Sequence, residues 1–158
     1  MVSAPLTTAG QEPDSKTRLR LWIRLLRASR LIEGVTRERL KTQFAATLPR
    51  FDVMAALYRQ PDGMLMSEIS RFLMVSNGNV TGIVDRLVAD GFVARSQRNG
   101  DRRTSFITLT RKGRSAFGEM AAAHESWVDE LLGGVSVRDA EQMSVKLKSF
   151  RSDWEGDA

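Results

Sequence analysis

Positive charge is concentrated in one short stretch of this 158-residue sequence. Residues 95–114 contain seven Lys or Arg residues and a single acid, Asp101, whereas the whole chain has a formal net charge of only +5. Guanidinium groups bind phosphate oxygens through paired N–H donors. The chemistry that this stretch indicates is therefore the binding of a polyanion.

The arginines surround a predicted turn. Asn99-Gly100 favours a two-residue hairpin, and the flanking segments "FVARSQ" and "TSFITL" have the composition of strands. An arginine at a hairpin tip can enter the narrow, negative minor groove of A·T-rich DNA. We therefore predict that Arg98, Arg102 and Arg103 contact DNA, and that Asp101 offsets their repulsion and braces the hairpin. The alternative is a charged loop that only faces solvent.

A helix is expected over residues 76–90, just before this hairpin. Its apolar residues recur at helical spacing: Val80, Ile83, Val84, Leu87 and Val88. The opposite face carries small and polar residues where an ordinary surface helix carries Lys and Glu, and this favours close approach to DNA. The candidate DNA contacts on this helix are Ser76 (also its N-cap), Asn77, Asn79, Thr81 and Arg86. A merely solvated face is the alternative.

Ile69, Phe72 and Leu73 mark a short helix before the one over residues 76–90. Two such helices joined by a tight turn and followed by a basic hairpin form a winged helix-turn-helix, whose second helix enters the major groove. We assign residues 49–114 to this DNA-binding lobe. Within it, "FDVMAALYRQ" predicts a helix that follows a break at Pro49. Gly91 is the expected C-cap of the helix over residues 76–90.

Long helices are predicted on both sides of the lobe. Residues 15–48 and 115–158 form a helical region, in which helix 1 runs to Ala46, Thr110 caps the next long helix, and Ser136 with Asp139 forms a capping box. Residues 1–14 have the composition of a disordered segment. Several apolar residues of this region need burial that a lone lobe cannot offer: Leu19, Trp22, Leu147, Phe150 and Trp154. An intertwined homodimer on a pseudo-palindromic DNA site satisfies this need.

Composition excludes several classes of function. The chain has no Cys and one His, so it has no thiol nucleophile, no Cys-ligated metal and no His pair for a metal site. It also lacks a phosphate-binding glycine loop. We predict that the protein is not an enzyme and needs no cofactor or metal. With no apolar leader or membrane span, we expect a cytoplasmic protein that does not contact a membrane.

The sequence resembles the MarR (multiple antibiotic resistance regulator) family of winged-helix transcription factors. The resemblance is carried by "RFDVMAALYRQPDG", "LMVSNGNVTGIVDRLVADGFVARSQRNGDRRTSFITLTRKG" and "HESWVDELL". It implies a mainly α-helical fold with a small β-hairpin wing, a dimer built from the first and last helices, and a ligand cleft beside the DNA-binding lobe. It also implies that Asp101 braces the wing while Arg103 reaches the minor groove. Leu65 departs from the Thr or Ser that caps the first motif helix in many members, so that cap is weakened or moves to Ser67.

The resemblance also suggests residues that could hold an effector. An apolar aromatic ligand could lie among Trp22, Met54, Tyr58, Met120 and His124, although core packing also explains each of them. The Arg20, Arg24 and Arg27 series on helix 1 could hold the phosphates of a coenzyme A thioester, because "SNGNVTG" is similar to a branch that responds to aromatic acids or their acyl-CoA esters. A solvated helix face is the alternative for these arginines.

The resulting hypothesis is a homodimeric, ligand-responsive regulator that binds double-stranded DNA. We expect a repressor that is released by a small aromatic acid or its acyl-CoA thioester. A non-specific architectural DNA-binding protein is the alternative, since it would bind all sequences with an affinity set mainly by salt.

Overall fold

The computed structural model describes residues 13–73, 77–97 and 105–155. Within these ranges the chain is mainly helical with one small antiparallel sheet, as the sequence predicts. The elements in chain order are α1 (Asp14–Phe44), α2 (Leu48–Tyr58), β1 (Met64–Leu65), α3 (Met66–Leu73), α4 (Asn77–Ala89), β2 (Val93–Gln97), β3 (Ser105–Leu109), α5 (Arg111–Leu131) and α6 (Val137–Glu155).

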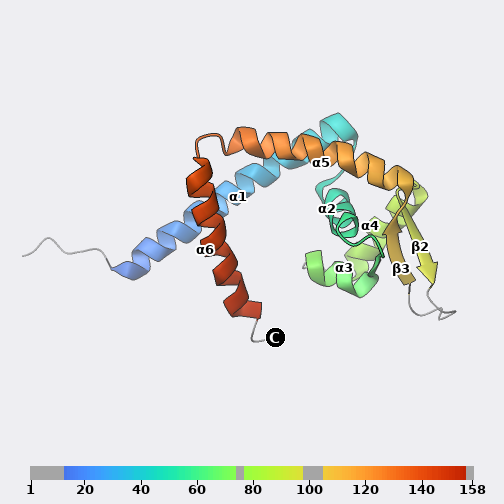
Figure 1. Cartoon of the computed structure of the whole chain (residues 1–158), viewed down its shortest axis with the longest axis horizontal. Coiled ribbons are helices and arrows are strands. Elements are labelled where there is room, and N and C mark those ends of the chain that lie inside the picture. The colour runs from blue at the N-terminus through green and yellow to red at the C-terminus, as the bar shows by residue number, and fades with distance from the viewer. Residues whose placement is uncertain (1–12, 74–76, 98–104, 156–158) are drawn as a thin grey trace, which may run out of the picture.

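Two long helices support a smaller lobe. In Figure 1, α1 and α5 lie side by side, and α2, α3, α4 and the sheet form a lobe at one end of this pair. The helix α6 leaves the far end of α5 at a steep angle. Arg39 of α1 donates two hydrogen bonds, of 2.8 and 3.2 Å, to the carboxylate of Glu130 on α5. This bidentate ion pair joins the C-terminal part of α1 to the C-terminal end of α5.

The sheet confirms the predicted hairpin and adds a third strand. The strands β2 and β3 pair antiparallel from Val93↔Leu109 to Gln97↔Ser105, and β1 adds to the other edge of β3 through Met64↔Ile107. With only two residues, β1 has no alternation that a sequence pattern could reveal. The Asn99-Gly100 turn lies outside the described residues.

The core lies between α2, α4, α5 and the sheet. On α4, Val80, Val84 and Leu87 are fully buried, which confirms the predicted apolar stripe, but Val88 lies at its margin with 37% of its surface exposed. Phe51 of α2 packs on Phe117 of α5 with ring centroids 5.4 Å apart. Because the stripe of α4 is buried in this core, the other face of the helix is turned outward.

The end of α1 and the start of α2 differ from the boundaries that the sequence predicts. Helix α1 ends at Phe44, because Ala45 takes a left-handed conformation (φ 50°), so the prediction that it reaches Ala46 was wrong by two residues. Pro49 does not act as a break between helices. It lies in the first turn of α2, where its missing N–H costs nothing, and Thr47 caps that helix.

Helix α3 begins without the hydroxyl cap that the resemblance implies. The cap does not move to Ser67, because Ser67 lies inside the helix, which starts at Met66. Instead, the Glu68 carboxylate accepts a hydrogen bond of 2.7 Å from the backbone N–H of Leu65. This is one half of a capping box, in which the acid in the first turn accepts a hydrogen bond from the backbone N–H of the residue just before the helix.

The outer parts of the long helices carry apolar surface that the single chain leaves exposed. On α1, Trp22 is 57% exposed and Leu19 is 55% exposed. On α6, Met143, Leu147 and Phe150 are spaced four and three residues apart, which places them on one helix face, and each is at least half exposed.

Candidate nucleic-acid interface and cavities

The outward face of α4 is the predicted recognition surface. Asn79, Thr81 and Arg86 are exposed on it, and Asn77 is the first residue of the helix. Gly78 and Gly82 share this face, and a Cβ atom added at either would meet no other atom within 4 Å. Packing among the described residues therefore does not explain these glycines. They leave a bare stretch of helix that another molecule can approach closely.

An acid on the same face is neutralised from the sheet. Asp85 of α4 is paired with the Arg95 guanidinium of β2. An unpaired carboxylate here would repel a phosphate, whereas the ion pair joins α4 to β2, the first strand of the hairpin. Sequence reasoning counted Arg95 only among the basic residues, because ten positions separate it from Asp85 and neither helical nor strand spacing links them.

The turn between α4 and β2 is tied to the start of α5. Gly91 ends α4 with φ 76°, as predicted for a C-cap. The Thr110 hydroxyl donates to the Gly91 carbonyl (2.7 Å) and accepts from the Gly113 N–H (3.0 Å), which confirms Thr110 as the N-cap of α5. A Cβ at Gly113 would lie 1.9 Å from the Phe92 carbonyl oxygen, so only glycine allows this contact. The end of α4, the start of β2 and the start of α5 are thus joined at this turn.

The remaining predicted DNA contacts lie outside the described residues. They are Ser76 before α4 and, in the hairpin, Arg98, Asp101, Arg102 and Arg103. The structure describes the two strands that carry the hairpin as far as the Gln97↔Ser105 pair.

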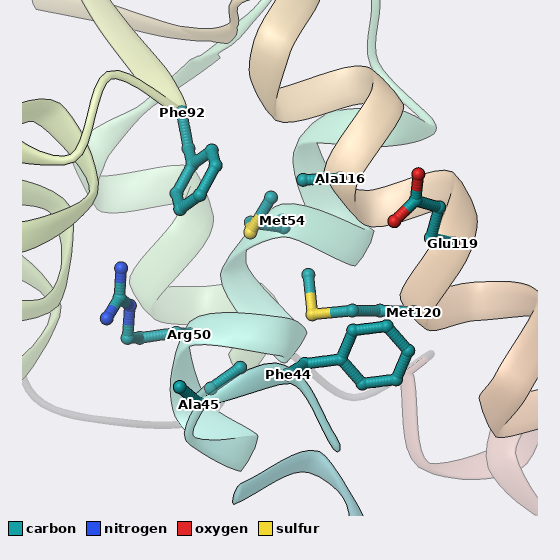
Figure 2. A pocket seen from close by; sticks show the side chains of 9 residues that line it. Phe44, Ala45, Arg50, Met54, Phe92, Ala116, Glu119 and Met120 are labelled. Atoms are coloured by element: carbon teal, nitrogen blue, oxygen red, sulfur yellow. The ribbon is translucent and has the colours of Figure 1, made fainter. Parts of the chain in front are cut away.

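An apolar cavity of about 100 Å³ lies between α2, α5 and the residues that follow α4. Figure 2 shows Met54 and Met120 at its centre, with the rings of Phe92 and Phe44 on two sides. The Arg50 and Glu119 side chains lie on opposite sides of it. Arg50 is ion-paired with Asp90, the residue that follows α4. Of the predicted ligand residues, the cavity brings together Met54 and Met120.

A wider groove of about 450 Å³ lies on the other side of α2 and holds the predicted ligand residue His124. Asp52 and Glu33 also line it. Burial raises the pKa of the Asp52 carboxyl, and the nearby charge of Glu33 adds to this shift. Burial lowers the pKa of His124, whose ring packs 5.0 Å from that of Phe51. Thr36 also lines the groove, and no described residue hydrogen-bonds its buried hydroxyl.

The other predicted ligand residues lie apart from both spaces. Tyr58 packs on Phe117 and under the Arg114 guanidinium, and it lines neither the cavity nor the groove. Trp22 is exposed on the outer half of α1, together with Arg20, Arg24 and Arg27. A ligand that joined these α1 residues to the groove would have to extend along the helix beyond Ser29, the groove's first α1 residue.

Known proteins are similar to this chain in both sequence and fold. The sequence model of the MarR family matches residues 46–105. The transcriptional activatory protein BadR of Rhodopseudomonas palustris is 30% identical over 131 residues, which cover 80% of this chain and 74% of BadR. A MarR family transcriptional regulator from Silicibacter pomeroyi is 33% identical, with a TM-score of 0.73 over 91% of this chain and 99% of that one.

A second similar structure contains a ligand. CouR from Rhodococcus jostii RHA1, bound to p-coumaroyl-CoA, has a TM-score of 0.72 at 19% identity, covering 82% of this chain and 90% of CouR. At this identity the likeness shows a common fold. Among the described residues, no helix is long and apolar enough to span a membrane.

Proposed function

Because the chain belongs to the MarR family of DNA-binding transcriptional regulators, we propose that it is a ligand-responsive homodimer that recognises a pseudo-palindromic DNA site and acts as a repressor. The observation that carries the proposal is the outward face of α4, where Asn79 and Arg86 lie beside two glycines that packing among the described residues does not require. The relatives are transcriptional regulators rather than enzymes.

In the proposed complex α4 enters the major groove. Asn79 reads a base edge, since its amide can both donate to and accept from adenine, while Arg86 contacts the backbone. The hairpin carried by β2 and β3 lies over the adjacent minor groove, where we propose that Arg103 inserts and that Arg98 and Arg102 bind phosphate.

An Arg103→Ala variant should reduce the dependence of DNA affinity on salt concentration by about one unit of slope per protomer.

The homodimer is supported by the exposed apolar residues of α1 and α6. A twofold partner buries these faces and sets two copies of α4 against half-sites about one helical turn apart, roughly 10 base pairs. The dimer also explains how an effector can act, because a small change in the angle between the two lobes removes the match to the half-site spacing.

The proposed effector is a small aromatic acid or its acyl-CoA thioester. CouR, which shares the fold, binds p-coumaroyl-CoA, and this chain has both an apolar cavity and a wider groove beside the lobe. For a thioester, the exposed arginines Arg20, Arg24 and Arg27 could hold the phosphates. BadR is an activatory protein, so activation is the other outcome when the sign of regulation is measured.

Fluorescence anisotropy on the DNA upstream of the protein's own gene tests this function. We expect tight binding to this DNA, weak binding to a scrambled duplex, and release by one member of a panel of aromatic acids and acyl-CoA esters. Equal binding to both duplexes, unaffected by every compound, would favour the architectural alternative, in which salt alone sets the affinity.

A further inference from the structure

We propose that the arginines on the first half of α1 form a second surface for DNA, which binds the phosphate backbone of a duplex other than the one held by α4. One protein dimer then bridges two duplexes. The inference rests on the proposed function, in which α4 holds the first duplex, and it adds a sequence-independent contact on a different part of the molecule.

The first half of α1 is strongly basic. Residues 15–32 contain six Lys or Arg residues and no acid, which is a larger positive balance than the +5 of the whole chain. Four exposed arginines follow one another at spacings of three or four residues, which places them along one side of the helix. We call these four residues the arginine stripe: Arg20, Arg24, Arg27 and Arg30.

The acids at the two ends of this segment do not neutralise the stripe. Asp14 pairs with Arg18 at 3.8 Å, and Glu33 pairs with Arg37 at 2.8 Å. Among the described residues, no acid forms an ion pair with the last three arginines of the stripe. The charge of these three guanidinium groups can therefore act on a polyanion outside the chain.

The opposite side of the same helix segment is apolar and faces the proposed dimer partner. Leu21, Trp22 and Leu25 each have more than a third of their surface exposed in the single chain. A partner that buries this side leaves the arginine stripe on the outside, because guanidinium groups without acids are costly to bury. A basic amphipathic helix can also bind an anionic membrane, but its apolar side must then enter the lipid, and the proposed dimer covers that side.

The stripe lies apart from the DNA-binding lobe. In Figure 1, the first half of α1 points away from α2, α3, α4 and the sheet. The buried residues of α1, Thr36 and Leu40, both belong to its second half, which packs near the lobe. A duplex that lies on α4 of the same chain therefore does not run along the stripe, and for this reason we assign the stripe to a different duplex.

The stripe matches a DNA backbone in length and charge. From Arg20 to Arg30 the helix rises by about 15 Å. Duplex DNA carries one negative charge for about every 1.7 Å of its axis, so a duplex that lies along the stripe presents phosphate to each arginine. Contacts with phosphate carry no sequence information, so this surface accepts any duplex. A coenzyme A thioester held by the same arginines would compete with the duplex.

Bridging of two duplexes tests the inference. The full-length protein is bound to the upstream duplex on beads, and capture of a labelled scrambled duplex from solution is measured. We expect the wild type to capture it, and the double variant Arg24→Gln, Arg27→Gln to capture it about tenfold less strongly or weaker, with unchanged affinity for the upstream duplex. The double variant Lys146→Gln, Lys148→Gln removes the same charge from exposed positions of α6, and it should capture as the wild type does.

The salt dependence of capture by the wild type is a second measure, which decides the outcome even if a variant fails to fold. Each phosphate contact contributes about −0.9 to the slope of log affinity against log salt, so the three arginines that no described acid pairs should give about −2.7. Raising the salt from about 50 to about 200 mM should therefore weaken capture about fortyfold. In the double variant of α1 the slope should fall to about −0.9.

A wild type that stays on the upstream duplex but captures no scrambled duplex would overturn the inference and leave the proposed function intact. Undiminished capture by the Arg24→Gln, Arg27→Gln variant would also overturn it, because the two lobes of the dimer would then hold both duplexes. Binding to phosphatidylglycerol vesicles without capture of DNA would assign the stripe to a membrane surface instead. If the protein prefers no sequence, the proposed function fails, and capture from beads that carry the scrambled duplex decides the inference.

Discussion

Asn79 is the residue on α4 that we expect to read sequence. It is exposed on the outward face, one position before the fully buried Val80. An Asn79→Ala variant should lose about 1–3 kcal/mol of operator binding and relax base preference at one position in each half-site. Binding to a library of operator variants measures both effects. Gln43→Ala, an exposed amide on α1, is the control, and a uniform loss across all sequences would show that Asn79 contacts only the backbone.

A substitution at Gly82 should affect helix stability and operator affinity in opposite directions. Because an added Cβ meets nothing within 4 Å, Gly82→Ala should stabilise α4 by about 1 kcal/mol through helix propensity alone. The same methyl group should lower operator affinity about tenfold if DNA approaches this face closely. Gly118→Ala on α5 is the matched control, since its Cβ is equally free. Unchanged operator affinity in Gly82→Ala would place DNA elsewhere.

His124 should make folding sensitive to mild acid. Burial lowers its pKa below the ordinary value of 6.5, so the folded state resists the proton that the unfolded chain accepts. The stability that depends on neutral His124 is complete above pH 6.5 and is lost as the pH falls toward the lowered value. The free energy of unfolding of His124→Gln, measured by urea titration from pH 7.5 to 5, should therefore fall less than that of the wild type.

Asp52, in the same groove, should give folding stability the opposite dependence on pH. Its pKa is raised, so ionisation of the folded state is disfavoured, and stability is lost as the pH rises above the ordinary aspartate value of 3.8. In Asp52→Asn this loss should be absent. Parallel pH profiles for the wild type and both variants would contradict the assigned environments of the two groups.

At the scale of elements, periodicity predicted most of the structure. The stripe of Val80, Val84 and Leu87 located α4, and the change to strand-like composition after Gly91 located the hairpin. These signals can be read from residues that are close together in the sequence, because one side of each element must be apolar. The strand β1 and the first turn of α2 at Pro49 were missed, since two residues have no period and proline suits a helix start as well as a break.

Contacts between elements could not be read from the sequence. The Asp85–Arg95 and Arg50–Asp90 pairs join residues ten and forty positions apart, and their charges are ordinary when seen in sequence. Gly113 shows the same limit. It is the last residue of the segment ending in "SFITLTRKG" that carries the resemblance, but only the close approach of the Phe92 carbonyl explains why a side chain is excluded there.

At the scale of the whole molecule, the exposed face of α6 should hold the dimer together. Leu147 is 50% exposed in the single chain and lies between Met143 and Phe150 on one face. Leu147→Glu places a charge in the proposed interface, and it should shift the protein from dimer to monomer in light scattering at micromolar concentration. Lys148→Glu is the control beside it. A wild type that is already monomeric would contradict the proposed assembly.

The proposed function depends above all on recognition of a particular DNA sequence by α4 and the wing. Fluorescence anisotropy with the upstream DNA and a scrambled duplex at one fixed salt concentration tests it most directly. We expect binding to the upstream site to be tighter by about 10³-fold or more. Equal affinity for the two duplexes, with the same dependence on salt, would contradict it.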